Sequence, residues 1–422
     1  MKQNCCRSKI AYHFEAAVEY LISILVTGAF LTALLNEIGV SDAISGTISS
    51  LTTFACMVQM ASLFIKRNGR QLKRWVSLLH LLNQLLFAIL YLFPSLKLSQ
   101  TTKALLMVGI YTAGLLISQL VTPYKLAWLM SLVEPKTRGK FTAVKEMISL
   151  LFGMFFSLIM GMVVDHFQAA GRIQEAFMIC NIVLVILALV HFLLLILCDP
   201  PETDKIKETN FKENIHYLYK NKKFHKILLA SSLFQCTQIV IPFYGVYQLN
   251  VLGFSLTYVS VLTIFQSLTR MTVSLPLGKY ADHTSWSKTL YLGFLMQGAA
   301  FFINFFTIPS NGHILFFIYS MLYGASMAAL NSSLMNIVFE YVDPTISAAA
   351  LGIENAIGGV TGFCASLIGG IVISHMQNLG NQLFGHTIYA QQLLSIFACI
   401  ACITGAVYTK RKLFPKVKQK AM

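Results

Sequence analysis

The chain has 422 residues, of which 56% are hydrophobic and 12% are charged, and its formal net charge is +15. A soluble domain has about twice this share of charged residues, so the composition excludes an ordinary soluble protein and indicates repeated transmembrane helices. The positive charge does not indicate nucleic-acid binding, because the basic residues fall in short segments between apolar stretches.

Apolar stretches long enough to cross a membrane recur along the whole chain. The predicted spans are 15–37, 43–65, 72–94, 104–130, 142–165, 176–198, 227–250, 256–277, 288–308, 313–337, 346–374 and 389–409. They predict an all-α membrane protein with 12 transmembrane helices.

A polar segment in the middle of the chain separates the first six spans from the last six, and it carries seven lysines. Four of its residues follow helical spacing and predict a short amphipathic helix on a membrane face: Phe211, Ile215, Leu218 and Tyr219. We therefore expect an N-terminal six-helix bundle at 1–198, a cytoplasmic basic linker at 199–226, and a C-terminal six-helix bundle with a basic tail at 227–422.

The distribution of basic residues predicts the orientation in the membrane. If the N-terminus is cytoplasmic, 28 of the 32 Lys and Arg residues lie in cytoplasmic segments, with Lys125 counted in the segment 125–145. Three lie in outer loops, and Arg270 is the one basic residue that is counted within a span and not with an adjoining segment. We expect a multi-pass protein of the cell (cytoplasmic) membrane whose N- and C-termini are both cytoplasmic.

Two predicted cytoplasmic segments carry related motifs. Gly278-Lys279-Tyr280-Ala281-Asp282 follows the eighth span, and Gly69-Arg70 belongs to the segment after the second. Together they resemble the loop signature of the major facilitator superfamily, roughly G-x-x-x-D-R/H-x-G-R/K, and segment 128–139 resembles the family's loop between spans four and five. Lys66 stands where the first copy should have its Asp, and Ser285-Trp286 replaces the trailing Gly-Arg of the second.

The resemblance implies two pseudo-symmetric six-helix bundles that alternate access to a central cavity. It also implies gating residues on the cytoplasmic side: Gly69, Arg70, Arg138, Gly278 and Asp282. A glycine lets two helices approach closely, and a carboxylate such as that of Asp282 can stabilise a neighbouring helix N-terminus. The alternative is that these charges only fix the topology.

Charged residues inside predicted spans are functional candidates, because a charge at membrane depth is costly unless it is paired or hydrated. The proton or ion-pair candidates are Glu19, Glu146, Arg270 and Glu354. The alternatives are a static ion pair or snorkelling to the interface. Glu15 is expected at the headgroup level, one turn from Glu19. We expect His191 to face lipid or pack at the periphery, so we do not assign it a role.

The resemblance implies that spans one, four, seven and ten line the cavity. The substrate-cavity candidates are Tyr111, Gln119, Gln235, Gln238, Tyr244 and Asn331. Each is also a candidate for a simple helix–helix hydrogen bond. Because the set is polar, aromatic and uncharged, it favours a neutral or weakly charged organic solute over a phosphate ester, which would need two or more Arg or Lys side chains.

We therefore predict a secondary active transporter that moves a small organic solute by alternating access, coupled to protons, as a monomer among membrane lipids. The alternatives are a lipid or glycolipid flippase, a drug efflux antiporter on the same scaffold, and a non-transporting membrane sensor. The sequence has no nucleophile–base set, phosphate-binding loop or metal-ligand cluster. We expect no enzyme activity, no cofactor, no metal and no nucleic-acid partner.

Overall fold

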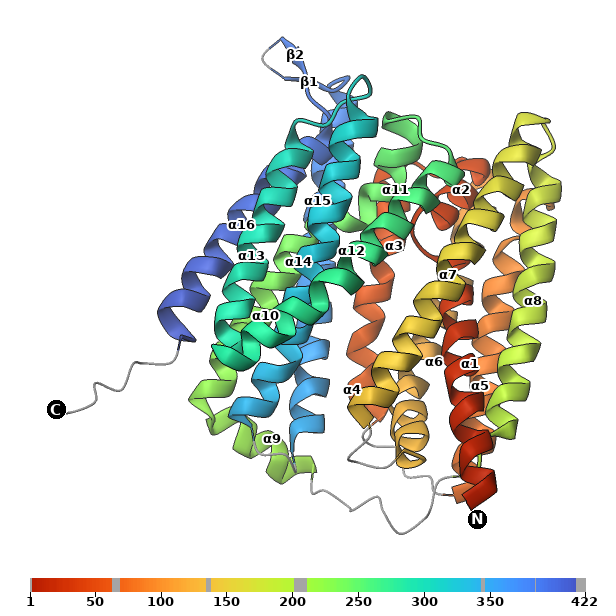
Figure 1. Ribbon diagram of the computed structural model, residues 1–422. Helices are drawn as coiled ribbons and strands as arrows, with labels where there is room; N and C mark the ends of the chain where they lie inside the picture. Colours follow the sequence, from red (N-terminus) through yellow and green to blue (C-terminus); the bar gives the residue numbers. More distant parts are fainter. Residues whose placement is uncertain are drawn as a thin grey trace. The chain divides into compact units, whose positions relative to one another are not determined.

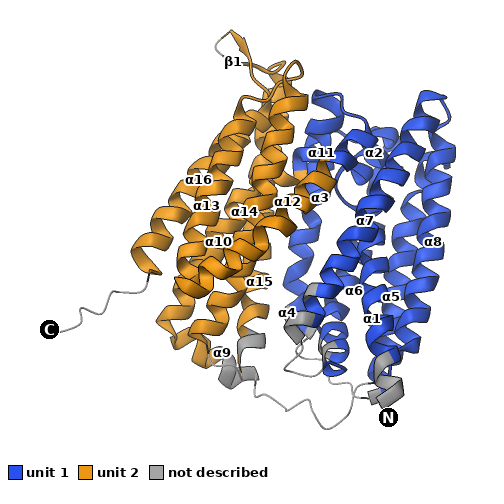
Figure 2. Ribbon diagram, in the orientation of Figure 1, with its two compact units in different colours: residues 1–208, 243–261 blue, residues 209–242, 262–422 orange. Residues whose placement is uncertain are grey.

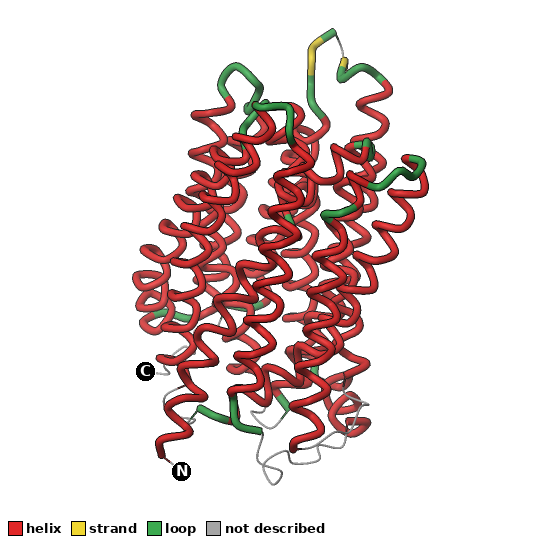
Figure 3. Tube along the Cα trace, turned by 90° about the vertical axis from the view of Figure 1, so that its right-hand side faces the viewer, coloured by secondary structure: helices red, strands yellow, loops and turns green. Residues whose placement is uncertain are grey.

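The computed structural model describes residues 2–62, 69–133, 138–200, 211–342, 346–383 and 385–414. Helices account for almost all of them, and a short antiparallel strand pair is the only other regular structure in these ranges (Figures 1 and 3). Among the described residues, eight helices are long and apolar enough to cross a membrane. The prediction of an all-α membrane protein is confirmed, and the full count of twelve crossings stays a prediction.

The chain forms two compact units (Figure 2). Unit 1 comprises residues 1–208 and 243–261, and unit 2 comprises residues 209–242 and 262–422. The apolar helical stretch Lys222–Val251 therefore contributes residues to both units. The predicted division into bundles at 1–198 and 227–422 stays a prediction.

Unit 1 is built from long helices joined by short connections. Its helical elements are α1 (Lys2–Val26), α2 (Gly28–Ile38), α3 (Asp42–Ala55), η1 (Cys56–Val58), α4 (Gln59–Ser62), α5 (Gly69–Leu90), η2 (Phe93–Ser95), α6 (Gln100–Ser131), α7 (Arg138–Ala169) and α8 (Ile173–Leu197), followed later in the chain by α11 (Tyr244–Val246), the π-helix η5 (Tyr247–Val251) and the start of α12 (Leu256–His283). Helix α1 packs against α7 and α8, and α5 packs against α6 and α8.

Unit 2 contains the remaining elements. These are α9 (Phe211–Lys220), α10 (Lys222–Thr237), η4 (Gln238–Phe243), the rest of α12, α13 (Trp286–Phe305), α14 (Gly312–Tyr341), α15 (Ser347–Asn378), β1 (Gln382–Leu383), β2 (His386–Thr387) and α16 (Ala390–Lys412). Helix α13 packs against α14 and α16, and α10 packs against α15 and α16. The short helix predicted in the linker is α9, which buries Leu218 in the apolar cluster of this unit and leaves Tyr217 and Tyr219 exposed.

The first predicted span is two helices, because the chain breaks between α1 and α2. Thr27 has an extended backbone and Gly28 has a φ of +59°, a left-handed conformation that glycine adopts without strain. The Thr27 hydroxyl donates a hydrogen bond to the carbonyl of Ser23 at 2.7 Å. The break redirects the chain at the level of the cavity described below.

Residues 243–261 join unit 1 through close packing and polar contacts. A Cβ added at Gly245 would overlap the side chain of Thr32, and one added at Gly46 would overlap the ring of Phe243. Asn36 Nδ2 donates to Asn250 Oδ1 at 2.7 Å, and Asn250 Nδ2 donates to the Asp42 carboxylate at 2.6 Å. The segment is thus fixed to α2 and α3 by hydrogen bonds between polar side chains.

The beginning of α12 is held by a carboxylate from α7. The backbone N–H groups of Leu256 and Thr257 donate to Asp165 Oδ1 and Oδ2 at 3.0 and 2.7 Å. Ser260 Oγ donates to the carbonyl of Ser157, also on α7, at 2.8 Å. A carboxylate at a helix N-terminus satisfies free N–H groups and interacts favourably with the helix dipole. Asp165 therefore serves as a cap supplied by a different helix.

We expect Asp165→Ala to lower the free energy of unfolding by about 1–2 kcal/mol, because two N–H groups at the start of α12 lose their acceptors. Thermal unfolding of the purified protein in detergent measures this change. The matched control is Glu37→Ala, which removes an exposed carboxylate from α2. Equal melting temperatures for the two variants would contradict the capping role.

Candidate functional site

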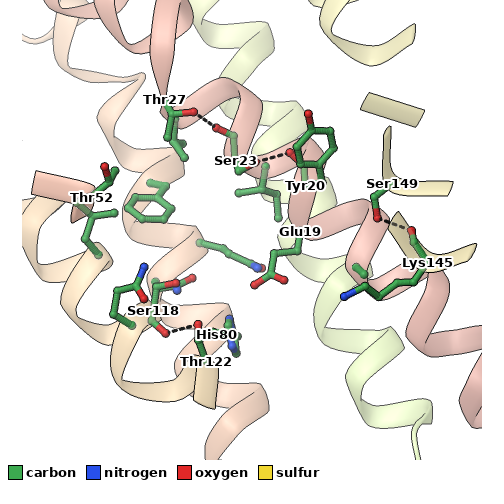
Figure 4. Close-up of a pocket in the computed structure, with 18 of the residues that line it drawn as sticks. Glu19, Tyr20, Ser23, Thr27, Thr52, His80, Ser118, Thr122, Lys145 and Ser149 are labelled. Atoms are coloured by element: carbon green, nitrogen blue, oxygen red, sulfur yellow. Dashed lines mark hydrogen bonds between the residues drawn. The ribbon is translucent and has the colours of Figure 1, made fainter. Parts of the chain in front are cut away.

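A cavity of about 500 Å³ lies within unit 1 (Figure 4). Helices α1, α3, α5, α6 and α7 line it. Its polar lining residues are Glu19, Tyr20, Ser23, Thr27, Thr52, His80, Asn83, Gln84, Ser118, Gln119, Thr122, Thr142, Lys145, Glu146 and Ser149. Ligand pockets in proteins commonly measure about 300–1,000 Å³, so the volume suits a small organic molecule.

Most hydroxyl groups of the cavity wall donate their protons to their own helix. Ser23 Oγ donates to the carbonyl of Tyr20 at 2.7 Å. Thr27, Thr52, Thr122 and Ser149 donate in the same way to backbone carbonyls three or four residues earlier. A hydroxyl used in this way offers only its oxygen lone pairs to a ligand. The wall is therefore rich in acceptors and suits a solute that brings O–H or N–H donors.

One face of α5 brings unsatisfied polar atoms to the cavity. His80, Asn83, Gln84 and Phe87 have the spacing of a single helix face. His80 Nε2, Asn83 Oδ1 and Gln84 Oε1 are buried and have no hydrogen-bond partner among the described residues. Buried polar atoms are normally satisfied, so these three atoms are candidates for hydrogen bonds to water or a ligand.

A cluster of charged residues adjoins this face. Lys125 Nζ on α6 donates to Glu15 Oε1 at 2.8 Å and also contacts the carboxylate of Glu19. His191 Nε2 on α8 lies 2.8 Å from the same Glu15 oxygen, and His191 Nδ1 lies 3.0 Å from Gln84 Nε2. Glu15 and His191 are fully buried, whereas the side chain of Glu19 is 37% exposed and lines the cavity. Four helices meet at this cluster.

The charge of the cluster is incompletely balanced when His191 is neutral, because two carboxylates face one ammonium group. Glu15, Glu19 and His191 place three possible ligand atoms within 4.8 Å of one another. The Lys125 ammonium already contacts both carboxylates, so it supplies the cation at this point. We assign the group as an ion-pair cluster and not as a metal centre.

Unit 2 contains a separate buried hydrogen-bond chain. Tyr323 Oη donates to Gln238 Oε1 at 2.7 Å, Gln238 Nε2 donates to Thr237 Oγ1 at 2.9 Å, and Thr237 Oγ1 lies 3.0 Å from Gln297 Oε1. Glu354 is 5% exposed and shares a hydrogen bond with Ser231. These groups link α10 and η4 to α13, α14 and α15.

Comparison with known proteins identifies the family. The sequence profile of the Major Facilitator Superfamily matches residues 16–365 and, in a second match, residues 236–421. The chain belongs to the Major Facilitator Superfamily. It is therefore a membrane transporter and not an enzyme. None of the curated protein sequences matches this chain.

Solved structures of the superfamily share the fold at low sequence identity. The nucleoside transporter NupG is 13% identical, with a TM-score of 0.70, over 97% of this chain and 100% of that chain. A bacterial homolog of the human lysosomal transporter Spinster is 14% identical, with a TM-score of 0.66, over 97% and 96%. A D-xylose-proton symporter is 13% identical, with a TM-score of 0.65, over 100% and 98%.

Only some of the residues singled out in the sequence lie at the cavity. Glu19, Gln119 and Glu146 line it, and Gln119 Oε1 accepts a hydrogen bond from Gln59 at 2.6 Å. Tyr111 is buried away from it and donates to the carbonyl of Val26 at 3.1 Å. The other candidates lie elsewhere: Gln235 against Gly358, Gln238 in the chain to Tyr323, Tyr244 buried in α11, Arg270 half-buried on α12, Asn331 exposed on α14, and Glu354 beside Ser231.

The predicted gating residues lie at helix ends. Gly69 and Arg70 begin α5, and Arg138 begins α7, with its side chain outside the described part of the structure. Gly278 and Asp282 belong to the last turns of α12, because this helix continues to His283 and not only to 277. Ser285 caps the following helix by accepting from the N–H of Lys288. The gating role of Asp282 stays a prediction.

Three expectations from the sequence are wrong. His191 is fully buried against Glu15 and does not face lipid, and Glu15 is enclosed by protein and not exposed to headgroups. Lys125 belongs to α6 and to the ion-pair cluster, not to a cytoplasmic loop. His80, Asn83 and Gln84 on α5 were not predicted as cavity residues, because the family resemblance implied a cavity lined by spans one, four, seven and ten. The signal was present in the spacing His80-x-x-Asn83-Gln84, which puts three polar side chains on one helix face.

We expect Lys125→Met to lower the free energy of unfolding by about 3–5 kcal/mol, because two buried or half-buried carboxylates would lose their common cation. Thermal unfolding in detergent tests this. Lys97→Met is the matched control, since it removes an exposed lysine from the same unit. If both variants melt at the wild-type temperature, the cluster does not stabilise the fold.

Proposed function

We propose that this protein is a secondary active transporter of a neutral organic solute of the sugar or nucleoside type, coupled to protons. The observation that carries the proposal is the composition of the cavity wall. Its hydroxyl groups donate to backbone carbonyls and so offer acceptor oxygens to a solute, and three polar atoms of α5 beside them have no partner among the described residues. A polyhydroxylated solute brings several O–H donors to such a wall. Tyr20 and Phe87 add aromatic surface against which a sugar or a base can pack.

The charges around the cavity also favour a neutral solute. Among the described lining residues, Lys145 is the cation and Glu19 and Glu146 are the carboxylates. A phosphate ester would be repelled by the two carboxylates and would need at least a second cationic contact. The fold is shared with a nucleoside transporter and a D-xylose-proton symporter, which makes these two solute classes the first to test.

The transport cycle we propose alternates access through movement of two six-helix bundles, 1–198 and 227–422, joined by the linker 199–226. In this cycle the contacts that hold residues 243–261 on α2, α3 and α7 break and re-form. The predicted gating residues Gly278 and Asp282 lie at the other end of α12. We also propose that both termini are cytoplasmic, which the distribution of basic residues supports. We further propose that the protein acts as a monomer in the cell membrane.

Proteoliposomes that contain the protein are expected to accumulate radiolabelled uridine or D-xylose when a proton gradient is imposed. Asn83→Leu and Gln119→Leu should each weaken binding of that solute about tenfold, which corresponds to the loss of one buried hydrogen bond of about 1–2 kcal/mol. Binding is measured by isothermal titration of the purified variants. Gln168→Leu, at an exposed position of α7, is the matched control.

Two outcomes would contradict this assignment. Variants with the affinity of the wild type would show that the unit 1 cavity is not the binding site. Failure to move either solute, together with transfer of a fluorescent phospholipid between leaflets, would favour the flippase alternative.

A disulfide between Asn36→Cys and Asn250→Cys is expected to stop uptake, because it would hold the segment around η5 on α2. Uptake should return after reduction. The experiment uses a background in which the native cysteines are replaced, with each single-cysteine variant as a control. Undiminished uptake by the cross-linked protein would show that this contact does not break during transport.

A further inference from the structure

We propose that the imidazole of His191 is the binding site of the coupled proton, and that the Gln84 amide turns over when this proton binds. The inference rests on the proposed function and deepens it, because it names the group that links proton and solute.

The hydrogen bonds around His191 define its neutral form. Gln84 Nε2 donates to His191 Nδ1 at 3.0 Å, so Nδ1 is the unprotonated nitrogen. The proton of the neutral ring is then on Nε2, which donates to Glu15 Oε1 at 2.8 Å. Gln84 Oε1, the other end of the same amide, is buried and has no partner among the described residues.

Protonation of the ring changes what Nδ1 requires. An added proton makes Nδ1 a donor, and the amide N–H of Gln84 can no longer face it. Rotation of the Gln84 amide by half a turn brings Oε1 to Nδ1, where it accepts the new hydrogen bond. The proton comes from water in the cavity and leaves to water when access has changed, and no other bond is made or broken.

The charge count supports one added proton. With neutral His191 the cluster holds the carboxylates of Glu15 and Glu19 against the single ammonium of Lys125. One proton on His191 brings its formal charge to zero. A buried group of charges is least costly when it is balanced and hydrogen-bonded.

The surroundings favour His191 over the two carboxylates as the site. A proton on Glu15 Oε2 would be a buried donor with no acceptor, because that oxygen has no partner in the described part of the chain. The Glu19 carboxylate is in contact with Lys125, and a proton on it would weaken this ion pair.

Every helix packed against His191 contributes a charged or titratable group. Helix α1 brings Glu15, Glu19 and Tyr12, α5 brings His80, and α6 reaches the cluster with Lys125. Helix α7, which also packs against α8, carries Lys145 and Glu146 on the cavity wall. The rings of His80 and His191 are 5.5 Å apart, and His80 lines the cavity, so it lies on a short route between water and the site.

The turn of Gln84 would couple the proton to the solute. Gln84 lines the cavity. When His191 is neutral, the end of the amide left for a ligand is its carbonyl oxygen; when His191 is charged, it is the NH₂ group. Protonation thus changes Gln84 from an acceptor into a donor, so a solute that offers an acceptor at this position binds best to the protonated protein.

The test compares driven accumulation with exchange in proteoliposomes, with uridine and D-xylose as probes. For one proton per neutral solute, a gradient of about one pH unit supports about tenfold accumulation. His191→Gln is expected to reduce the accumulation ratio to about one while exchange of solute at equal pH continues. His166→Gln, at an exposed position on α7, should accumulate as the wild type does. Full accumulation by His191→Gln, or its loss only in Glu19→Gln, would overturn the proposal.

A second measurement, the titration of the histidine rings, depends neither on the solute nor on the folding of His191→Gln. In protein labelled with ¹³C-histidine, one buried imidazole should change from the neutral to the charged spectrum as the pH is lowered, and this change should be altered in Gln84→Leu. Gln84→Leu should also remove the pH dependence of solute binding. A His191 signal that stays neutral until the protein unfolds would overturn the proton site. If neither probe is transported but the imidazole titrates, the solute assignment fails and the proton site stands.

Discussion

The structure of unit 1 depends on one carboxylate oxygen. Glu15 Oε1 accepts hydrogen bonds from Lys125 on α6 and His191 on α8 at the same time, 2.8 Å from each. Since Glu15 is fully buried, neither donor can be removed without leaving a charge or a polar group unsatisfied. Gln84 extends these contacts to α5, so they fix the positions of four helices relative to one another at this level. Apolar packing is not directional and could not fix the relative positions of the helices as precisely as these polar contacts do.

The cavity follows from this arrangement. Glu19, one turn after Glu15, shares Lys125 and reaches the cavity wall, while the same face of α5 that meets His191 turns Asn83 toward the empty volume. The cavity and the charge cluster are therefore formed by the same helices. At the other end of α7, Asp165 holds the start of α12, so this helix carries both a wall of the cavity and a contact that opens in the proposed transport cycle. In the proposed transport cycle, helix α7 connects the cavity to the contact at Asp165.

Hydropathy predicted the helical, membrane-spanning class of the protein, because each span must satisfy its backbone internally. It did not predict the break between α1 and α2. It also drew attention to Glu19, a carboxylate within a span. The role of Lys125 was not predicted, because a count of basic residues assigns a lysine near a span end to the adjoining loop. The role of His191 was not predicted either, because one histidine in an apolar helix carries no periodic signal. Packing between segments far apart in the sequence decides which faces of α1, α5, α6 and α8 meet. Glu15 and His191, for example, are 176 residues apart.

The most direct test of this account is a double-mutant cycle between Glu15→Gln and Lys125→Met, with the free energy of unfolding measured for the wild type, both single variants and the double variant. If the two side chains form the buried pair described here, the double variant will be more stable than the sum of the single losses predicts, by about 1–3 kcal/mol. Additive losses, with a coupling energy near zero, would contradict the central role of the Glu15 carboxylate.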